Sequence, residues 1–191
     1  MTERMHDAVV VGASAGALDA LSALLPALPG DFPLPIMIVV HLPADKDSAL
    51  AELLNRKCSL PVREAQDKER IAPSTIYVAP PDYHLLVEPN LHLSLSSDEP
   101  VLFSRPSIDV LFETAADAYG DRLIGIVLSG GNSDGAKGLQ AICKAGGMGW
   151  VQDPQTANAR AMPEAALKAC PDAQAFTLEQ MAICLKESAH G

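Results

Sequence analysis

Short apolar runs alternate with stretches of helical spacing along most of the chain. The apolar runs are rich in Val and Ile and predict buried strands, whereas the stretches between them predict amphipathic helices. The predicted strands are AVVVG at 8–12, IMIVVHL at 36–42, LIGIVLSG at 123–130 and GWVQD at 149–153, and the predicted helices are 16–28, 47–57 and 135–147. This alternation indicates crossover units on a parallel sheet that helices cover on both faces.

The pattern changes between Pro61 and Pro100. Residues 75–88 and 91–96 alternate apolar and polar positions with a period of two, and the Pro89-Asn90 pair between them favours a turn. We therefore expect a β-hairpin, or a small antiparallel excursion, inserted at this point of the chain.

Helical spacing resumes in two later segments. Residues 107–120 predict a helix with Ser107 as its N-cap and Gly120 as its stop, and residues 176–190 predict a closing helix. The expected fold is α/β: a doubly wound, mainly parallel sheet between helical layers, a Rossmann-like three-layer sandwich with an inserted β-hairpin. A length of 191 residues fits one domain over residues 1–191.

Composition narrows the function classes. The formal net charge of −10 and the pI near 4.8 oppose binding to nucleic acid or to anionic membranes. The polar N-terminus MTERMHD and the short apolar run after it match neither a signal peptide nor a membrane span. The four cysteines, at 58, 143, 170 and 184, include no C-x-x-C pair, so we expect reduced thiols in a cytoplasmic protein and neither zinc ligation nor disulfides.

The segment VVVGASAG at 9–16 enters a glycine turn that two kinds of site could use. A dinucleotide fingerprint needs a glycine at its middle position, where Ser14 stands here, and an acid at the end of the second strand, which instead ends in His41. Read as G-x-S-x-G, the same residues place Ser14 on a tight strand-to-helix turn, as a nucleophile requires. A serine that only caps the first helix is the structural alternative.

Two further strand ends carry residues that would complete a hydrolytic site. His41 ends the second predicted strand, and Asp134 lies in the loop SGGNSDGAKG after the strand at 123–128. Functional groups of doubly wound sheets gather at the carboxyl ends of strands, so Ser14, His41 and Asp134 are candidates for nucleophile, base and orienting acid. Taken singly, His41 could be a buried hydrogen-bonded residue and Asp134 a helix cap.

The chain resembles the chemotaxis protein-glutamate methylesterases, the CheB family. The resemblance rests on blocks that occur in family order from about Ala8 to Lys168: VVVGASAGALDAL, IVVHLP, IYVAPPDYHLLV, RPSIDVLFETAA, IVLSGGNSDGAKGL and VQDPQTANARAMPEAAL. By this likeness Ser14 is the nucleophile, His41 the general base and Asp134 the residue that orients it. The backbone amides of Ala15 and Gly131 are the implied oxyanion donors.

The resemblance also implies an activity. It predicts hydrolysis of glutamate γ-methyl esters on the cytoplasmic helices of chemoreceptors to glutamate and methanol, with receptor glutamine deamidation as an allied reaction. No metal and no organic cofactor is expected, and other chemosensory pathway proteins are further candidate partners. A catalytically weak interaction module of such a pathway is the alternative, and nucleotide binding at the glycine turn is a third hypothesis.

The sequence departs from the family pattern in several places. Gly131, Asn132 and Ser133 stand where Met, Gly and Asn are common, and added glycine freedom could loosen the oxyanion hole. Ala15 stands where Thr is frequent, and we expect a catalytic domain alone, without the receiver domain of full-length enzymes. His84, Arg105 and Lys137 stay outside the predicted catalytic set, His84 as a candidate structural histidine and Arg105 as a candidate surface ion pair.

Overall fold

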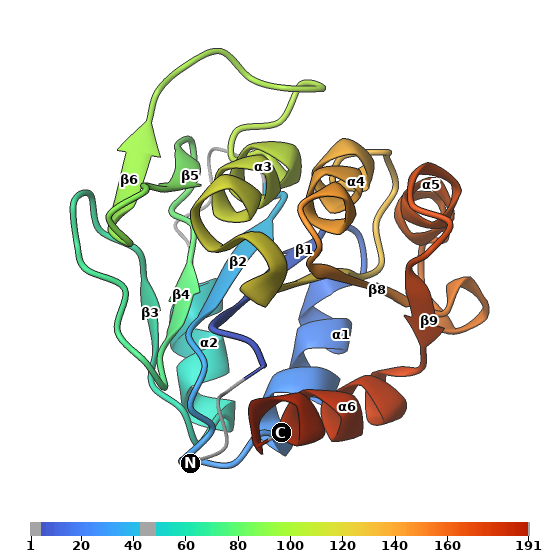
Figure 1. Cartoon of the computed structure of the whole chain (residues 1–191), viewed down its shortest axis with the longest axis horizontal. Coiled ribbons are helices and arrows are strands. Elements are labelled where there is room, and N and C mark those ends of the chain that lie inside the picture. The colour runs from blue at the N-terminus through green and yellow to red at the C-terminus, as the bar shows by residue number, and fades with distance from the viewer. Residues whose placement is uncertain (1–4, 43–48, 191) are drawn as a thin grey trace.

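The structure, a computed structural model, describes residues 5–42 and 49–190. Within these ranges a seven-stranded sheet has the order β3-β4-β2-β1-β7-β8-β9, with every neighbouring pair parallel (Figure 1). The strands are β1 Ala8–Ala13, β2 Ile36–Val40, β3 Val62–Glu64, β4 Ile76–Val78, β7 Leu123–Val127, β8 Met148–Gln152 and β9 Gln174–Phe176. The order reverses between β1 and β7, which confirms the doubly wound α/β fold.

Helices cover both faces of this sheet. The α-helices are α1 Ala17–Leu24, α2 Leu50–Lys57, α3 Ile108–Tyr119, α4 Ala136–Lys144, α5 Ala161–Ala169 and α6 Leu178–His190, and short 3-10 turns lie at Leu25–Ala27, Gly120–Arg122 and Pro154–Thr156. Figure 1 shows α1, α2 and α6 on one side of the sheet and α3, α4 and α5 on the other. The result is a three-layer sandwich.

Alternation along the central strand builds the two halves of the core. Val9 and Val11 of β1 pack in the cluster that holds α1, α2 and α6, whereas Val10 packs in the cluster that holds α3, α4 and α5. Successive side chains of a strand point to opposite faces, so a continuous apolar run suits a strand buried on both sides. All six residues of β1 are buried, as the sequence pattern indicates.

The inserted hairpin is present but shorter than expected. β5 His84–Val87 pairs antiparallel with β6 Leu93–Ser96 through the turn at Pro89-Asn90. The first part of the predicted period-two segment behaves differently, because Ile76–Val78 forms β4 and joins the parallel sheet between β2 and β3. All three β4 residues are buried, as in a strand covered on both faces, and the period-two pattern alone does not reveal this.

Helix boundaries agree with the sequence in most places. Gly120, with φ of 58°, ends α3 as predicted, and Asp47 and Ser48, the predicted start of the second helix, lie outside the described residues. Phe176 was expected in the closing helix but belongs to β9, where it pairs with Gln152 of β8. Its ring packs edge-on against Trp150, with ring centroids 5.5 Å apart, so packing at the sheet edge decides this boundary.

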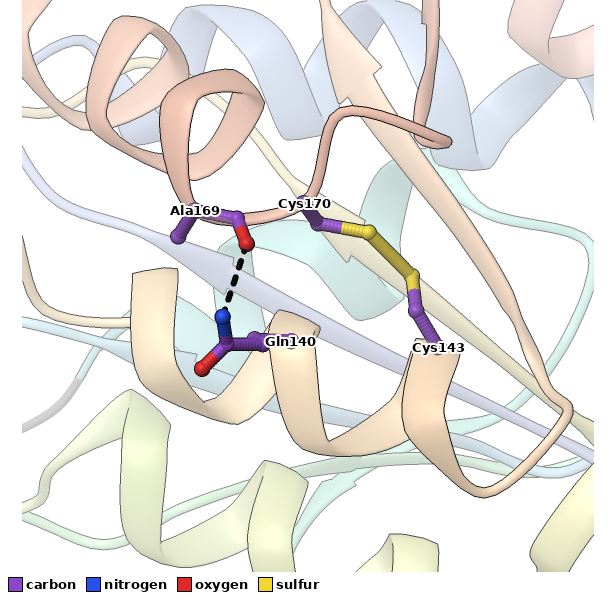
Figure 2. Close-up of a disulfide and its surroundings, with 4 residues drawn as sticks. All are labelled: Gln140, Cys143, Ala169 and Cys170. Carbon is purple, nitrogen blue, oxygen red and sulfur yellow. Dashed lines mark hydrogen bonds between the residues drawn. A yellow bond between two sulfur atoms is a disulfide. The ribbon is translucent and has the colours of Figure 1, made fainter.

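One expectation about cysteine is wrong. Cys143, near the end of α4, forms a disulfide with Cys170, the residue that follows α5, as Figure 2 shows. The two residues are 27 positions apart, and only the packing of α4 beside α5 brings their Cα atoms to 7.0 Å. A hydrogen bond of 3.0 Å from the Gln140 side chain to the Ala169 carbonyl joins the same helix ends. Cys58 and Cys184 are free, as expected.

Candidate active site

Ser14 lies on the tight turn between β1 and α1. Its backbone N–H donates to the carbonyl of Ser129 at 2.9 Å, and the hydroxyl of Ser129 donates to the carbonyl of Ala15 at 2.7 Å, so the turn is tied to the end of β7. Gly16 begins α1 with φ of 81°, a conformation that side chains other than glycine rarely adopt. A Cβ at Gly16 would also approach the Ser129 hydroxyl to 2.9 Å. These contacts hold Ser14 beyond the carboxyl end of β1.

His41 follows the neighbouring strand. Its backbone N–H donates to the carbonyl of Ala13 at 3.2 Å, which continues the β1–β2 pairing past the last strand residue. Ser14 and His41 therefore lie at adjacent strand ends, and both line a pocket of about 230 Å³ between α1 and the start of α2. No hydrogen bond joins their side chains within the described residues; such contacts often tighten only when substrate binds.

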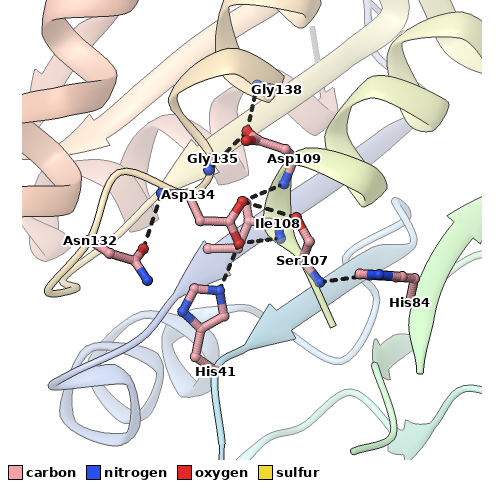
Figure 3. A network of polar contacts seen from close by, with 9 residues as sticks. All are labelled: His41, His84, Ser107, Ile108, Asp109, Asn132, Asp134, Gly135 and Gly138. Carbon is pink, nitrogen blue, oxygen red and sulfur yellow. Dashed lines mark hydrogen bonds and ion pairs between the residues drawn. The ribbon is translucent and has the colours of Figure 1, made fainter. Parts of the chain in front are cut away.

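Asp134 is buried and meets His41 from the loop between β7 and α4. His41 Nε2 lies 2.7 Å from Asp134 Oδ2, with side-chain exposures of 11% and 0%. Figure 3 shows the carboxylate at the start of α3, where it also accepts three hydrogen bonds from that helix end. The donors are the Ile108 amide at 2.7 Å, the Asp109 amide at 3.0 Å and the Ser107 hydroxyl at 3.1 Å.

These donors determine the charge of Asp134. Burial alone raises the pKa of a carboxyl group, but hydrogen bonds from His41 and from the amides of Asp109 and Ile108 outweigh it, and the pKa of Asp134 is lowered. An ionised carboxylate only accepts hydrogen bonds, so Nε2 of His41 must donate. The Nδ1 atom of the neutral ring then carries the lone pair that can take a proton.

The altered loop before Asp134 supplies its own support. The side-chain oxygen of Asn132 accepts a hydrogen bond of 3.0 Å from the Asp134 amide. Such a turn orders the backbone locally, and the family's usual glycine at this position would lack the side chain that makes it. The departure from the family pattern at Asn132 therefore adds a constraint next to Asp134.

Ala15 and Gly131, the predicted oxyanion donors, are exposed at the same end of the sheet. Ala15 directly follows Ser14, and Gly131 lies in the loop after β7. No described residue accepts a hydrogen bond from either backbone amide, so both N–H groups remain available to a ligand. Whether they serve as donors stays a prediction.

The three residues left outside the catalytic set also have defined places. His84 is buried, accepts a hydrogen bond from the Ser107 amide at Nδ1 (3.1 Å) and donates from Nε2 to the carbonyl of Glu99 (2.9 Å), which makes it a structural histidine. Arg105 forms an ion pair of 2.8 Å with Asp82. Lys137 lines a different pocket, on the α3–α4–α5 side of the sheet.

Sequence reasoning missed the residues that support Asp134. Ser107 does precede α3 as predicted, but its hydroxyl caps no amide of that helix and donates to Asp134 instead. Asp109 was not singled out at all, although its carboxylate is buried beside Asp134. An acid in the first turn of a helix otherwise indicates dipole stabilisation, so only its burial distinguishes Asp109 from an ordinary surface residue.

The fold and site define a three-layer α/β protein with a Ser, His and Asp cluster at the point where strand order reverses, the arrangement typical of acyl hydrolases. A family model described as CheB methylesterase matches residues 9–185. A protein of Leptospira interrogans, provisionally named protein-glutamate methylesterase/protein-glutamine glutaminase, is 47% identical over 177 residues, which cover 93% of this chain and 92% of that one. The chain therefore belongs to the CheB methylesterase family.

Two further matches agree. A protein-glutamate methylesterase/protein-glutamine glutaminase of Cupriavidus metallidurans is 39% identical over 91% of this chain, but this chain spans only 49% of that protein. The crystal structure of the Thermotoga maritima CheB methylesterase catalytic domain superposes with a TM-score of 0.91 at 29% identity, covering 95% of this chain and 98% of that one. The recognition made from sequence motifs is confirmed.

Proposed function

We propose that this chain hydrolyses glutamate γ-methyl esters on the cytoplasmic helices of chemoreceptors, releasing methanol. The single observation that carries the proposal is the hydrogen bond of 2.7 Å between His41 and a buried Asp134, beside a pocket that Ser14 and His41 share. The names of the relatives from Leptospira and Cupriavidus supply the substrate class. The family match supports the same chemistry.

The first half of the proposed reaction is acylation. The Ser14 hydroxyl attacks the ester carbonyl carbon, while Nδ1 of His41 takes the hydroxyl proton. The tetrahedral intermediate collapses, the carbon–oxygen bond to the methoxy group breaks, and the His41 imidazolium returns the proton so that methanol leaves. Asp134, held ionised by its hydrogen bonds, stabilises the imidazolium without taking its proton.

The second half is hydrolysis of the glutamyl-enzyme. Water attacks the carbonyl carbon of the ester that joins the substrate to Ser14, and His41 takes a proton from the water. The bond between that carbon and the Ser14 oxygen then breaks, His41 returns the proton to the Ser14 oxygen, and the glutamate leaves. A glutamine side chain would give the same acyl-enzyme with ammonia as the leaving group. The relatives' second name, protein-glutamine glutaminase, supports this allied deamidation.

The oxyanion of each tetrahedral intermediate needs fixed donors. The amides of Ala15 and Gly131 are the proposed pair, because both are exposed at the rim and neither donates to a described residue. Removal of one such donor in a hydrolase typically costs about 2.7–4 kcal/mol of barrier stabilisation. The Ser14, His41 and Asp134 side chains and these two backbone amides are the groups that the proposed chemistry uses.

The setting of the proposed reaction is the cytoplasm, with residues 1–191 acting as one catalytic domain. No helix in the described part of the chain is long and apolar enough to cross a bilayer. Because the chain has a net charge of −10, its docking to an anionic surface would depend on local patches rather than on long-range attraction. Methylated receptor helices are the proposed partner, and other chemosensory proteins are further candidates.

Methanol release from a methyl-esterified receptor fragment tests the proposal. The purified chain should release methanol in proportion to time, and Ser14→Ala should abolish release while leaving the circular dichroism spectrum unchanged. Ser22→Ala is a matched control, because Ser22 lies on α1 and, among the described residues, its hydroxyl accepts a hydrogen bond only from Lys57. Ammonia release from a glutamine-bearing fragment tests the allied reaction in the same way.

Two results would contradict the proposal. Equal methanol release by the wild type and by Ser14→Ala would show that Ser14 is not the nucleophile. No release by a folded wild-type protein, together with tight binding to the receptor fragment, would favour the interaction-module alternative.

A further inference from the structure

A second carboxylate lies directly behind the Asp134 side chain. Asp109, in the first turn of α3, is only 4% exposed, and its backbone amide donates to Asp134 Oδ1 at 3.0 Å. Figure 3 shows its own carboxylate turned the other way, toward the start of α4. There Asp109 Oδ1 accepts hydrogen bonds from the amides of Gly135 (2.9 Å) and Gly138 (2.8 Å).

The two acids cap each other's helices. Asp134, which immediately precedes the Gly135 cap of α4, accepts from the amides at the start of α3, and Asp109, in α3, accepts from the amides at the start of α4. A helix start leaves its first amides without partners and carries a partial positive charge, so each carboxylate meets a need of the opposite helix. The exchange fixes the two helix ends relative to each other.

The backbone next to Asp134 explains why this exchange matters for the site. Gly135 has φ of 96°, and a glycine there can take up many other conformations if its amide is not held. The Asp109 carboxylate holds that amide and the one three residues further on. A displacement of about 1 Å in a reacting group can lower a rate by roughly 100-fold.

We propose that Asp109 is a positioning residue for the triad: by accepting from Gly135 and Gly138, it fixes the segment from which Asp134 reaches His41. This inference rests on the proposed function, since it assigns Asp109 a role in the same acyl transfer. Asp109 touches neither Ser14 nor His41 in the hydrogen-bond network of the described residues, and acts only through Asp134.

The charges around Asp109 are mixed. Asp134 and Glu113 are the acids that act on it, while Lys137 of α4 and Lys168 of α5 line a pocket of about 460 Å³ together with Asp109. Burial is the largest effect and raises the pKa of Asp109 to about 6, and the charge of Asp134 adds to it, whereas the amides of Gly138 and Gly135 oppose it. The Asp109 side chain therefore accepts from the two amides although its burial disfavours the charged form of the carboxyl group.

Three substitutions separate position from charge. Asp109→Asn keeps an oxygen that can accept from both amides, so kcat should stay within about 3-fold of wild type. Asp109→Glu keeps the charge but moves the acceptor by one methylene, and Asp109→Ala removes it; both should lower kcat by at least about 10-fold with KM within about 2-fold. Asn55→Ala is the matched control, because Asn55 accepts from a backbone amide, that of Val62, away from the site.

Steady-state methanol release measures kcat and KM, and the acylation burst with p-nitrophenyl acetate reports on Ser14 without a receptor substrate. If the wild type shows a Ser14-dependent burst and Asp109→Glu matches its rate, or if Asp109→Asn loses as much as Asp109→Glu, the positioning role is overturned. If the wild type shows no Ser14-dependent turnover of either p-nitrophenyl acetate or a methyl-esterified receptor fragment, the proposed function itself fails and this inference fails with it. Asp109→Asn and Asp109→Glu decide the matter even if Asp109→Ala does not fold.

Discussion

His41 Nε2 and Asp134 Oδ2 lie 2.7 Å apart although 93 positions separate the two residues in the chain. The contact spans the reversal of strand order, since His41 follows β2 and Asp134 follows β7, with β1 and Ser14 between them. Because the carboxylate is ionised, it accepts from Nε2–H and leaves Nδ1 unprotonated in the neutral ring. The geometry therefore selects one ring nitrogen as the base.

The tautomer of His41 is the first prediction. Nitrogen NMR of the free protein, recorded with the imidazole in its neutral form, should show His41 protonated at Nε2 and unprotonated at Nδ1, since Asp134 accepts only from the former. In His41→Gln the corresponding signals should vanish, which assigns them. A neutral ring protonated at Nδ1 would contradict the orientation described here.

Asp134→Asn should abolish most activity while preserving the fold. The new amide can donate to Nε2 of His41, which would force the ring proton onto Nδ1, the nitrogen needed as base; in a serine protease triad the analogous change lowers kcat by about 10⁴-fold. Steady-state methanol release measures kcat, and circular dichroism checks folding. Retention of more than a tenth of wild-type kcat would contradict the role assigned to Asp134.

How far the sequence predicts this site depends on the kind of contact. Ser14, His41 and Asp134 each follow an apolar run, and the rule that strand ends of a parallel sheet share one edge is enough to bring them together. The structure confirms the His41–Asp134 contact. The catalytic roles themselves stay predictions, as do the oxyanion roles of Ala15 and Gly131.

The sequence does not reveal contacts that depend on how helices pack. The sequence does not indicate that Cys143 and Cys170 are paired, because only the packing of α4 beside α5 brings them together. Asp109 and Ser107 look like ordinary helix-start residues, because local capping rules assign their side chains to their own helix. Only the position of α3 against α4 directs Asp109 and Ser107 to the other segment.

Gly12→Ala should destabilise the protein through α3. A Cβ at Gly12 would approach Ile108 Cδ1 to 2.8 Å and Cγ1 to 2.9 Å, so the start of α3 would have to move. Overpacking of this kind costs about 1–3 kcal/mol, and because the Ile108 amide donates to Asp134, kcat should fall as well. Urea unfolding measures the first effect and methanol release the second.

A double-mutant cycle tests whether Ile108 is the cause. Adding Ile108→Ala to Gly12→Ala removes the clashing atoms, so the double variant should be more stable than the sum of the single effects by about 1 kcal/mol or more. Strict additivity of the two unfolding free energies would show that the Gly12 effect arises elsewhere.

Asp109 should lower stability at neutral pH even as it positions Asp134. Its pKa is raised to about 6 in the folded protein from an ordinary value of 3.8, chiefly by burial. A carboxyl group with a raised folded pKa contributes stability that is fully present below pH 3.8 and is lost as the pH rises through about 6. A shift of about two units corresponds to about 3 kcal/mol.

Asp109→Asn removes this ionisation but keeps the acceptor. The unfolding free energy of Asp109→Asn minus that of the wild type should therefore grow by about 2 kcal/mol between pH 4 and pH 7.5, measured by urea denaturation at each pH. The same difference for Asn55→Ala should stay flat, because no titrating group is removed. If the difference between Asp109→Asn and the wild type does not change with pH, then the burial of Asp109 beside Asp134 does not oppose its ionisation. A difference that grows with pH would instead show that ionisation of Asp109 opposes folding, as its burial beside Asp134 leads us to expect.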